Sequence, residues 1–480
     1  MKKLTKTMRA RAVLPEKVLQ FGEGNFLRAF IDWMFHRMNE TGVFNGSAVV
    51  VQPLETGLVE TLNEQDALYT LYLRGIENGE TLNQHELITS VSRGLNPYAA
   101  WDDYLATARN PAMRYVVSNT TESGIAYVKT AKPETCPASF PAKLTAWLAA
   151  RFDAFGGSAA SGMVFLPCEL INHNGAVLKE CILKHSKDWK LGADFEAWIE
   201  NDCTFLSTLV DRIVPGYPRD EAEAMSADLG YEDQLICTGE LFHLLVIEGP
   251  EALKAELPFH EAGLNVVWTD DMQPYRNRKV GILNGAHTAS VLASYLGGLD
   301  TVREMMQDDN FGPYVKNLVF DEIVPALPMD RLEAESFAAA VVERFLNPFI
   351  RHELLSISLN SVSKWKVRVL PSVKRYIDAF GKPPALLSFS LAALIAFYKG
   401  GLREGYAPND DPDVLEFFSK VWKSDDATTV VHGVLSHEGF WGEDLTRLPG
   451  LEDAVAASLE LIIKDGSRDA IKNIMGGINE

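Results

Sequence analysis

The sequence predicts an α/β N-terminal half built on a parallel sheet, followed by a mostly α-helical C-terminal half. Two observations divide the 480-residue chain in this way. Up to about residue 272, short β-rich runs alternate with helix-forming stretches, a rhythm typical of parallel strands covered by helices. From residue 273 onward, apolar residues recur at helical spacing and strand signals are scarce. We therefore expect two domains, residues 1–272 and residues 273–480.

The strands expected in the first half are short runs rich in β-branched and aromatic residues. In chain order they read KVLQFG, SAVVVQP, RYVVSNTT and GMVFLPCEL, with LNVVWTDD closing the half near residue 270. The helices expected in the second half include the stretches FAAAVVERFL, LLSFSLAALIAFYKG, VLEFFSKVW and LEDAVAASLELIIKDG. A site is expected between two such domains, where clefts commonly form.

Composition narrows the class of protein. The net charge of −20 makes nucleic acid an unexpected partner, although a local positive pocket could still bind a small anion. The chain contains no run of about 18 uncharged apolar residues, so we expect no membrane span. The basic N-terminus lacks the apolar segment of a secretory signal. Five cysteines without a CxxC pair argue against a disulfide framework or structural zinc, so a cytoplasmic location is expected.

A glycine turn follows the first expected strand, in the stretch QFGEGNFLRAF. Gly22 and Gly24 suit a tight turn that lets the backbone approach a diphosphate at the start of a helix. Arg28, one turn into that helix, could add positive charge. Leu27 stands where the dinucleotide-binding fingerprint has its third glycine. This stretch alone therefore leaves two alternatives, a phosphate cradle and an ordinary strand–helix turn.

The ends of two later strands bear on the cofactor. The second strand runs into Gln52 and Pro53, with Glu55 just beyond and no basic residue nearby, which favours NAD over NADP. The third strand ends in SNTTESG, whose hydroxyl groups suit contacts to ribose or nicotinamide. An ordinary polar loop is the alternative for this segment.

Three polar residues interrupt an apolar helix in the stretch RNRKVGILNGAHTASV. On an ideal α-helix Asn284 and His287 lie about 60° apart, and Lys279 lies within an arc of roughly 140°. Reduction of a ketone needs a proton donor at the carbonyl oxygen and further donors that stabilise the developing alkoxide. Lys279, Asn284 and His287 could form that set. The structural alternatives are a solvated lysine, a helix–helix hydrogen bond and a satisfied core histidine.

Two further stretches offer substrate contacts. LVDRIVPGYPRD contains Asp211 and Arg212, for which a structural ion pair is the alternative. SVSKWKVRVLPS contains Lys364, Lys366 and Arg368, for which a solvated basic face is the alternative.

The chain resembles the long-chain mannitol dehydrogenase family, which comprises zinc-independent, NAD(P)-dependent polyol and uronate oxidoreductases. The motifs that carry the resemblance, in the family's order, are QFGEGNFLRAF, QDALYTL, SNTTESG, STLVDRIVPGYPRD and RKVGILNGAHTA. The resemblance implies a Rossmann-like NAD-binding domain followed by a mostly helical domain. It also implies that Lys279 is the general acid/base, that Asn284 and His287 orient the substrate, and that no metal takes part.

Within that family, FGEGNFLRAF, PCELI, GYPRDE and LLSISLN are most similar to the branch that reduces tagaturonate. This implies reversible, NADH-dependent reduction of D-tagaturonate to D-altronate, a step of galacturonate catabolism. The expected partners are a small anionic sugar acid and, at most, further copies of the chain, as a monomer or small homo-oligomer. The residues expected to bind NAD are Leu19, Gln20, Phe21, Gly22, Glu23, Gly24, Asn25, Phe26, Leu27, Arg28, Ala29, Phe30, Thr120, Thr121 and Glu122, and those expected to bind substrate are Asp211, Arg212 and Lys364.

Several alternatives stay open at this point. Fructuronate reductase or a mannitol/polyol 2-dehydrogenase would share the fold and the lysine. A zinc-dependent medium-chain polyol dehydrogenase would need metal ligands, for which Cys168 with Glu169 is the one adjacent candidate pair. A dinucleotide-binding sensor would need no catalytic residue at all.

One position departs from the family. Polyol dehydrogenases of the family have an asparagine where this chain has Leu170, so half of the expected oxyanion hole is absent or replaced, with Asn172 and Asn174 as candidate substitutes. A uronate also requires a cation for its carboxylate. The cluster from Lys364 to Arg368 is the first candidate, and Arg351 with His352 is the second.

Overall fold

The computed structural model describes residues 1–7, 12–121 and 123–478 of the chain. Its contacts divide the chain into two compact units. The first contains residues 1–74 and 81–272, and the second contains residues 75–80 and 273–480. Among the described residues, no helix is both long enough and apolar enough to cross a membrane.

The first unit is built on a six-stranded, fully parallel sheet with the strand order β5-β2-β1-β6-β7-β8. This confirms the predicted Rossmann-like α/β class, and four of the expected runs form β1, β2, β6 and β7. The strands of this sheet are β1 (Glu16–Phe21), β2 (Ser47–Val51), β5 (Val91–Leu95), β6 (Tyr115–Ser118), β7 (Val164–Pro167) and β8 (Thr204–Phe205).

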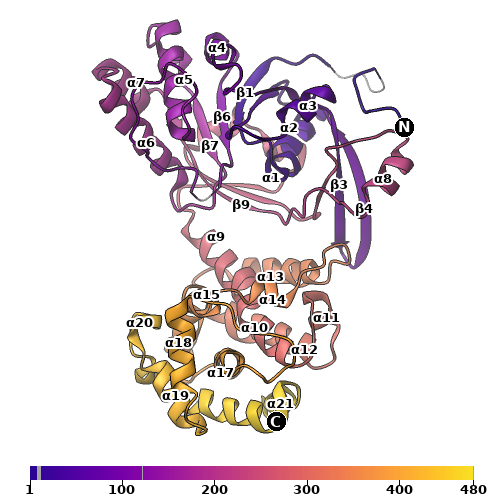
Figure 1. Cartoon of the computed structure of the whole chain (residues 1–480), viewed down its shortest axis with the longest axis vertical. Coiled ribbons are helices and arrows are strands. Elements are labelled where there is room, and N and C mark those ends of the chain that lie inside the picture. Colours follow the sequence, from indigo (N-terminus) through magenta and orange to yellow (C-terminus); the bar gives the residue numbers. More distant parts are fainter. Residues whose placement is uncertain (8–11, 122, 479–480) are drawn as a thin grey trace. The chain divides into compact units, whose positions relative to one another are not determined.

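Both faces of the main sheet are covered, as Figure 1 shows. Alternate residues of β1 enter different cores: Val18 packs with helices α1 and α2, whereas Leu19 and Phe21 pack with helices α4 to α7. Burial on both faces explains why these strands are continuous apolar runs. The helices of this unit are α1 (Asn25–Ala29), α2 (Ile31–Glu40), α3 (Val59–Glu64), α4 (Trp101–Ala106), α5 (Phe140–Phe155), α6 (Asn174–Trp189), α7 (Ala193–Asn201) and α8 (Ala222–Leu229).

Two small sheets complete the first unit, and the sequence patterns did not predict them as separate layers. One has the order β10-β3-β4, and the other has the order β12-β11-β9. The run LNVVWTDD contains β12, which therefore belongs to a different sheet from the other expected runs. The strands are β3 (Tyr69–Glu77), β4 (Glu80–Ile88), β9 (Ser207–Asp211), β10 (Cys237–Gly239), β11 (Leu244–Glu248) and β12 (Val266–Thr269).

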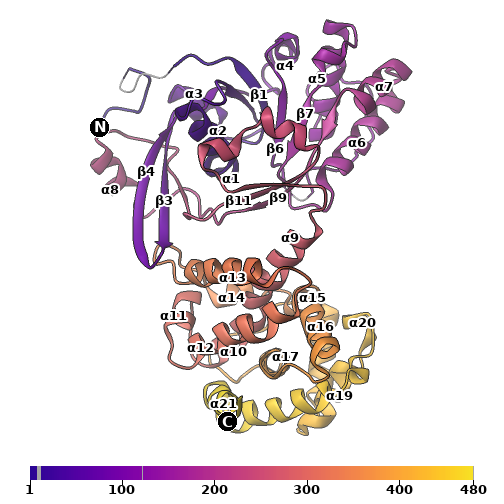
Figure 2. The same ribbon diagram turned by 180° about the vertical axis from the view of Figure 1, so that it is seen from behind.

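The second unit is helical, as predicted (Figure 2). Helix α17 is buried along nearly its whole length and packs against α10 and α21, so it forms the centre of this unit. A continuous helical run crosses from α9 through a π-helical segment, Lys279–Asn284, into α10. The helices are α9 (Gln273–Arg278), α10 (Gly285–Leu296), α11 (Val302–Gln307), α12 (Phe311–Asn317), α13 (Arg331–Phe345), α14 (Leu354–Ile357), α15 (Ser361–Arg368), α16 (Leu370–Phe380), α17 (Ala385–Lys399), α18 (Pro412–Val421), α19 (Ala427–Leu435), α20 (Glu438–Trp441) and α21 (Leu451–Ile478).

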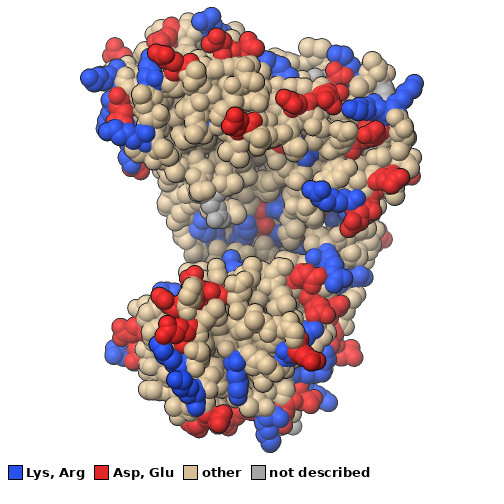
Figure 3. Space-filling view, viewed as in Figure 1, with Lys and Arg blue, Asp and Glu red and all other residues tan. Residues whose placement is uncertain are grey.

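Charged side chains are mixed on the surface. On the face drawn in Figure 3, acidic and basic side chains both occur on each unit, between broad uncharged areas.

Candidate active site

The glycine turn after β1 has the geometry that close backbone approach requires. Gly22 has a φ of +123°, a conformation that residues with a Cβ rarely adopt. Its N–H donates to the Val51 carbonyl at 3.1 Å, and a methyl group added there would lie 3.1 Å from the Asn119 carbonyl oxygen. Gly24 caps the start of α1 and has open space in front of its Cα. The turn therefore brings bare backbone to the carboxyl edge of the parallel sheet.

Arg28 does not extend toward that edge. Its guanidinium is buried and donates to the Glu23 carbonyl at 3.2 Å, the Leu235 carbonyl at 2.5 Å and the Asn25 Oδ1 at 2.6 Å. These bonds fasten the glycine turn to the β10 region. Arg28, which the sequence suggested as a partner for a diphosphate, thus holds the turn in shape.

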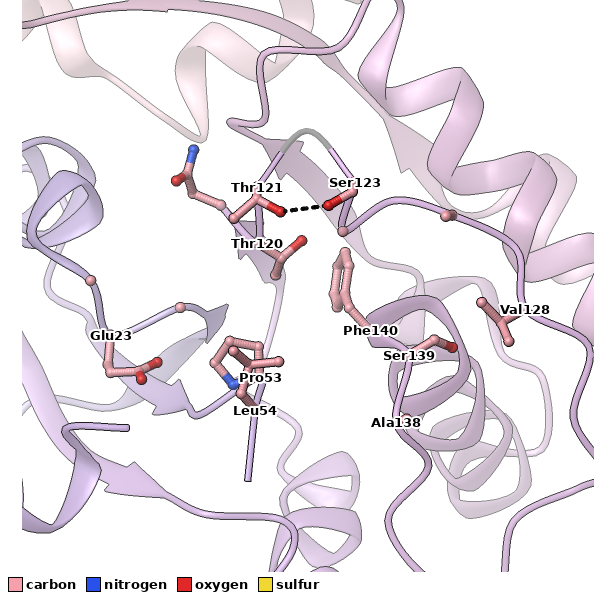
Figure 4. Close-up of a pocket in the computed structure, with 15 residues that line it drawn as sticks. Glu23, Pro53, Leu54, Thr120, Thr121, Ser123, Val128, Ala138, Ser139 and Phe140 are labelled. Carbon is pink, nitrogen blue, oxygen red and sulfur yellow. Dashed lines mark hydrogen bonds between the residues drawn. The ribbon is translucent and has the colours of Figure 1, made fainter. Parts of the chain in front are cut away.

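A cavity of about 630 Å³ lies at the carboxyl ends of β1, β2 and β6 (Figure 4). Ligand sites in α/β sheets occupy this edge, and their volumes are typically about 300–1,000 Å³. The glycine turn, the segment after β2, the segment after β6 and the start of α5 all contribute to its wall. Its lining consists of Gly22, Glu23, Gly24, Pro53, Leu54, Asn119, Thr120, Thr121, Ser123, Gly124, Ala126, Val128, Ala138, Ser139 and Phe140.

The residues after β6 are held by a buried acid that the sequence patterns did not single out for this purpose. Glu169 accepts hydrogen bonds from Ser118 Oγ, Thr120 N and Thr120 Oγ1, each at 3.0 Å. Burial raises the pKa of Glu169, and these donors oppose that rise. Thr121 adopts a φ of +85° and its hydroxyl lies 3.2 Å from that of Ser123. Glu122 lies outside the described residues.

This use of Glu169 leaves the zinc alternative without its ligand pair. Cys168 is buried and its thiol donates to the Leu166 carbonyl, and burial raises its pKa. Among the described residues, no three histidine, cysteine or acidic side chains converge as a metal site would require.

The predicted catalytic residues of the second unit share one helical run, but the run is not an ideal α-helix. Residues 279–284 form a π-helix, in which backbone hydrogen bonds join residues five apart. Lys279 and Asn284 therefore lie nearly above one another, closer than the α-helical arc predicted. Asn284 and His287 are then three residues apart and face the same side at the start of α10. π-Helical segments of this kind often occur at functional sites.

His287 occupies a buried pocket bordered by positive groups. Its ring stacks on Phe345 at a centroid distance of 4.1 Å and meets His352 edge-on at 5.0 Å. Burial, followed by the nearby His352, Arg344 and Arg368, holds the pKa of His287 well below its usual value. The imidazole is therefore neutral near pH 7. Its Nε2 is buried without a hydrogen-bond partner among the described residues.

The side chains of the basic stretch on α15 have different neighbours. Arg368 Nη1 donates to Thr288 Oγ1 at 3.4 Å, which places it beside His287. Lys364 Nζ donates to the Ile357 carbonyl at 3.0 Å, and its pKa is lowered by burial and by Arg368. Trp365 turns inward and donates to Ser390 Oγ at 3.1 Å.

Arg351 and His352, the second candidate pair for binding a carboxylate, also have different neighbours. Arg351 is largely exposed and pairs with Glu353 at 2.5 Å, whereas His352 packs against His287. Arg351 therefore already has an acidic partner.

Asp211 and Arg212 have structural surroundings. Arg212 is buried and donates to the carbonyls of Ala29, Leu241 and Phe242 at 2.7, 3.2 and 3.2 Å. Its guanidinium also lies 4.2 Å from the ring centroid of Trp33. Asp211 is buried at the end of β9. Arg212 thus joins β9 to the α1–α2 junction.

Of the two candidates to replace the family asparagine missing at Leu170, Asn174 is held by other contacts. Asn174 is fully buried, with Nδ2 donating to the Pro167 carbonyl at 2.9 Å and Oδ1 accepting from Thr208 N at 2.9 Å. Its amide is committed to the chain's own backbone. Asn172 and Leu170 are both exposed.

Two family models match consecutive parts of the chain. The mannitol dehydrogenase Rossmann domain matches residues 16–261, and the mannitol dehydrogenase C-terminal domain matches residues 271–463. The chain belongs to the mannitol dehydrogenase family. The resemblance predicted from the motifs is thereby confirmed.

Two altronate oxidoreductases are similar to this chain over nearly its whole length. An altronate oxidoreductase of Phocaeicola vulgatus is 44% identical over 99% of this chain and 100% of the relative. An altronate oxidoreductase of Yersinia enterocolitica is 47% identical over 95% of this chain and 96% of the relative.

Two solved dehydrogenase structures share the fold of this chain. A D-sorbitol dehydrogenase in substrate-free form matches with a TM-score of 0.81 and 22% identity, covering 98% of this chain and 100% of its own. Mannitol 2-dehydrogenase of Pseudomonas fluorescens, solved as a ternary complex with NAD and D-mannitol, matches with a TM-score of 0.68 and 22% identity over 99% of each chain.

Proposed function

We propose that this member of the family is an NAD-dependent altronate oxidoreductase, also called tagaturonate reductase. It interconverts D-altronate and NAD⁺ with D-tagaturonate, NADH and a proton. The observation that carries the proposal is the 44–47% identity to altronate oxidoreductases over at least 95% of this chain. Because the compared spans cover at least 95% of this chain, they extend through both units.

The cavity of the first unit is the proposed NAD site. Gly22 and Gly24 admit the diphosphate to the backbone, and the hydroxyl-rich segment after β6 lines the same cavity. When bound, the nicotinamide supplies or accepts the hydride at the carbon that carries the reacting oxygen. Everything else in the reaction is assigned to side chains of the chain itself.

Lys279 is the proposed general acid in the reductive direction. Its ammonium transfers a proton to the carbonyl oxygen as that oxygen gains negative charge, and the neutral amine recovers the proton in the oxidation of altronate. Asn284 Nδ2 and the neutral His287 donate hydrogen bonds to the same oxygen. The partnerless Nε2 of His287 supports this role, because an unsatisfied buried nitrogen destabilises the fold by about 1–3 kcal/mol unless a ligand meets it.

Arg368 and Lys364 are proposed to bind the substrate carboxylate. Both lie on α15, one helical turn apart, and Arg368 reaches α10 one residue beyond His287. Two neighbouring cations repel each other unless an anion joins them, and a carboxylate accepts two parallel hydrogen bonds from a guanidinium. A polyol would leave this pair without a counter-charge, which favours the sugar acid as substrate.

Initial rates of NADH and NADPH oxidation with tagaturonate, fructuronate and fructose test the proposal. The highest kcat/KM is expected with tagaturonate and NADH. A clear preference for fructuronate or fructose would assign the chain to another activity of the family. Loss of turnover after chelation would instead point to a metal enzyme, and absence of turnover with intact NADH binding would favour a sensor.

A further inference from the structure

The segment after β2 does not provide the acid that usually meets the cofactor ribose. In Rossmann folds that acid stands at the end of the second strand. Here Gln52 turns inward, and its Nε2 donates to the carbonyls of Leu54 and Glu55 at 2.9 and 3.0 Å. Pro53 and Leu54 line the cavity, whereas Glu55 is exposed and is not among the described residues of the wall.

A carboxylate nevertheless reaches this place from the glycine turn. Glu23, between the two glycines, lines the cavity, and Figure 4 shows its side chain extending from the turn toward Pro53 and Leu54. A methyl group on Gly57 would overlap Glu23 Oε1 and would lie 2.7 Å from Gln52 Oε1. The carboxylate therefore packs directly on the loop that connects β2 to α3, in a space that only glycine at position 57 leaves open.

Two backbone donors hold this carboxylate in place, and they oppose the rise in its pKa that burial causes. The backbone N–H groups of Glu23 and Leu58 face it, and no salt-bridge partner lies within 4.0 Å of it among the described residues. Arg28 is near enough to act on it electrostatically, but its guanidinium bonds to the Glu23 carbonyl and not to the carboxylate. An acid aimed at a diphosphate would repel it, whereas an acid aimed along β2 would meet the ribose.

We propose that Glu23 accepts hydrogen bonds from the adenosine ribose hydroxyls and thereby selects NAD(H) over NADP(H). It takes the place of the acid that other dinucleotide-binding folds carry at the end of the second strand. The 2′-phosphate of NADP(H) would face this carboxylate and be repelled. The inference rests on the proposed function only in taking a nicotinamide dinucleotide as the ligand.

Fluorescence titrations of the full-length protein without any sugar test the proposal. The ligands are NADH, NADPH and the 2′-deoxyadenosine analogue of NADH, and the variants are Glu23→Ala, Glu23→Gln and the control Glu55→Gln. The unmodified protein should bind NADH about 10- to 100-fold more tightly than the deoxy analogue, the range expected for a hydrogen bond to a charged group. Glu23→Ala should bind both equally, and both Glu23 variants should bind NADPH more tightly than the unmodified protein does. Glu55→Gln should behave as the unmodified protein.

Equal discrimination against the deoxy analogue in the unmodified protein and in Glu23→Ala would overturn the assignment, as would loss of discrimination in Glu55→Gln. Glu23→Gln has the size of the original side chain, and an unchanged Tm will show that it is folded. These titrations contain no sugar. Failure to reduce tagaturonate would therefore overturn the proposed function, but the dinucleotide affinities would still test the role of Glu23.

Discussion

The imidazole of His287 and the phenyl ring of Phe345 stack with centroids 4.1 Å apart and planes inclined by 13°. Phe345 ends α13, whereas His287 lies near the start of α10, so the pair joins two helices. The stack covers one face of the imidazole and contributes to the burial that keeps it neutral.

Replacing Phe345 by alanine should therefore let water reach His287 and raise its pKa toward its ordinary value. His352, Arg344 and Arg368 would still oppose protonation, so a partial rise is expected. The NMR titration profile of the His287 ring against pH should therefore move to higher pH than in the unmodified enzyme. Phe345→Tyr, which keeps a ring for the stack, should retain the original profile. An unchanged profile in Phe345→Ala would show that stacking on Phe345 does not determine the charge state of His287.

Lys279→Ala should lower kcat for tagaturonate reduction by about 10²- to 10⁴-fold, the usual contribution of a general acid. The dissociation constant for NADH should not change, because the lysine acts on the sugar oxygen. Lys279→Arg should be nearly as slow, since a guanidinium holds its proton too tightly to exchange it. Lys316→Ala, at an exposed position of α12, is the matched control and should keep full activity. Retained turnover in Lys279→Ala would remove the lysine from the mechanism.

Arg368→Ala should raise KM for tagaturonate about 10- to 100-fold, the loss expected for a charge-assisted hydrogen bond. Lys366 offers a control on the same helix, because its ammonium lies beside Gly442 and away from Thr288. Lys366→Ala should leave KM unchanged. Steady-state kinetics of the two variants provide the comparison, and equal effects would show that general positive charge, not a defined contact, is what matters.

Arg212→Ala should lower the free energy of unfolding of the first unit by about 3–5 kcal/mol, because three buried carbonyls lose their donor. Urea unfolding followed by tryptophan fluorescence would measure this. Arg212→Lys should restore only part of the loss, since one ammonium cannot match the fork of a guanidinium. A normal unfolding curve together with a raised KM for tagaturonate would return Arg212 to the substrate site.

Glu322 should give the second unit a stability that depends on pH. Its carboxylate accepts the N–H groups of Leu386 and Leu387, each at 2.8 Å, at the start of α17. Burial nevertheless raises its pKa from 4.5 to about 7. The folded state then binds a proton that the unfolded state releases, so stability is highest below pH 4.5 and falls as the pH rises through about 7.

Glu322→Gln removes this titration. Relative to the variant, the unmodified protein should lose about 3 kcal/mol of unfolding free energy between pH 4.5 and 7.5. Glu443→Gln, which changes a partly exposed acid paired with Lys374, serves as the control. A constant difference between Glu322→Gln and the unmodified protein across this range would contradict the raised pKa.

Much of the fold could be predicted because burial leaves a direct pattern in the chain. Strands covered on both faces appear as apolar runs such as SAVVV, and helix α17 appears as fifteen mostly apolar residues. The hairpin of β3 and β4 left no such pattern, because β4 is largely polar and exposed. Its existence depends on pairing that no local run of residues specifies.

The three polar residues of the helical run could be singled out from the sequence, but their relative geometry could not. An apolar helix interrupted by three polar side chains has the same sequence pattern whether it is α or π. The extra residue in the turn therefore could not be predicted from the sequence. The uses of Arg28 and Arg212 were hidden for another reason. Their partners Leu235 and Ala29 stand 207 and 183 residues away along the chain.

The π-helical turn at residues 279–284 contains one residue more than a regular α-helical turn would. Deleting one residue from this turn would restore a regular α-helix with a full set of four-residue hydrogen bonds, and that chain should be more resistant to heat. It would also rotate Lys279 by about 100° relative to Asn284 and His287. Under the proposed mechanism, one deletion would therefore exchange turnover for stability.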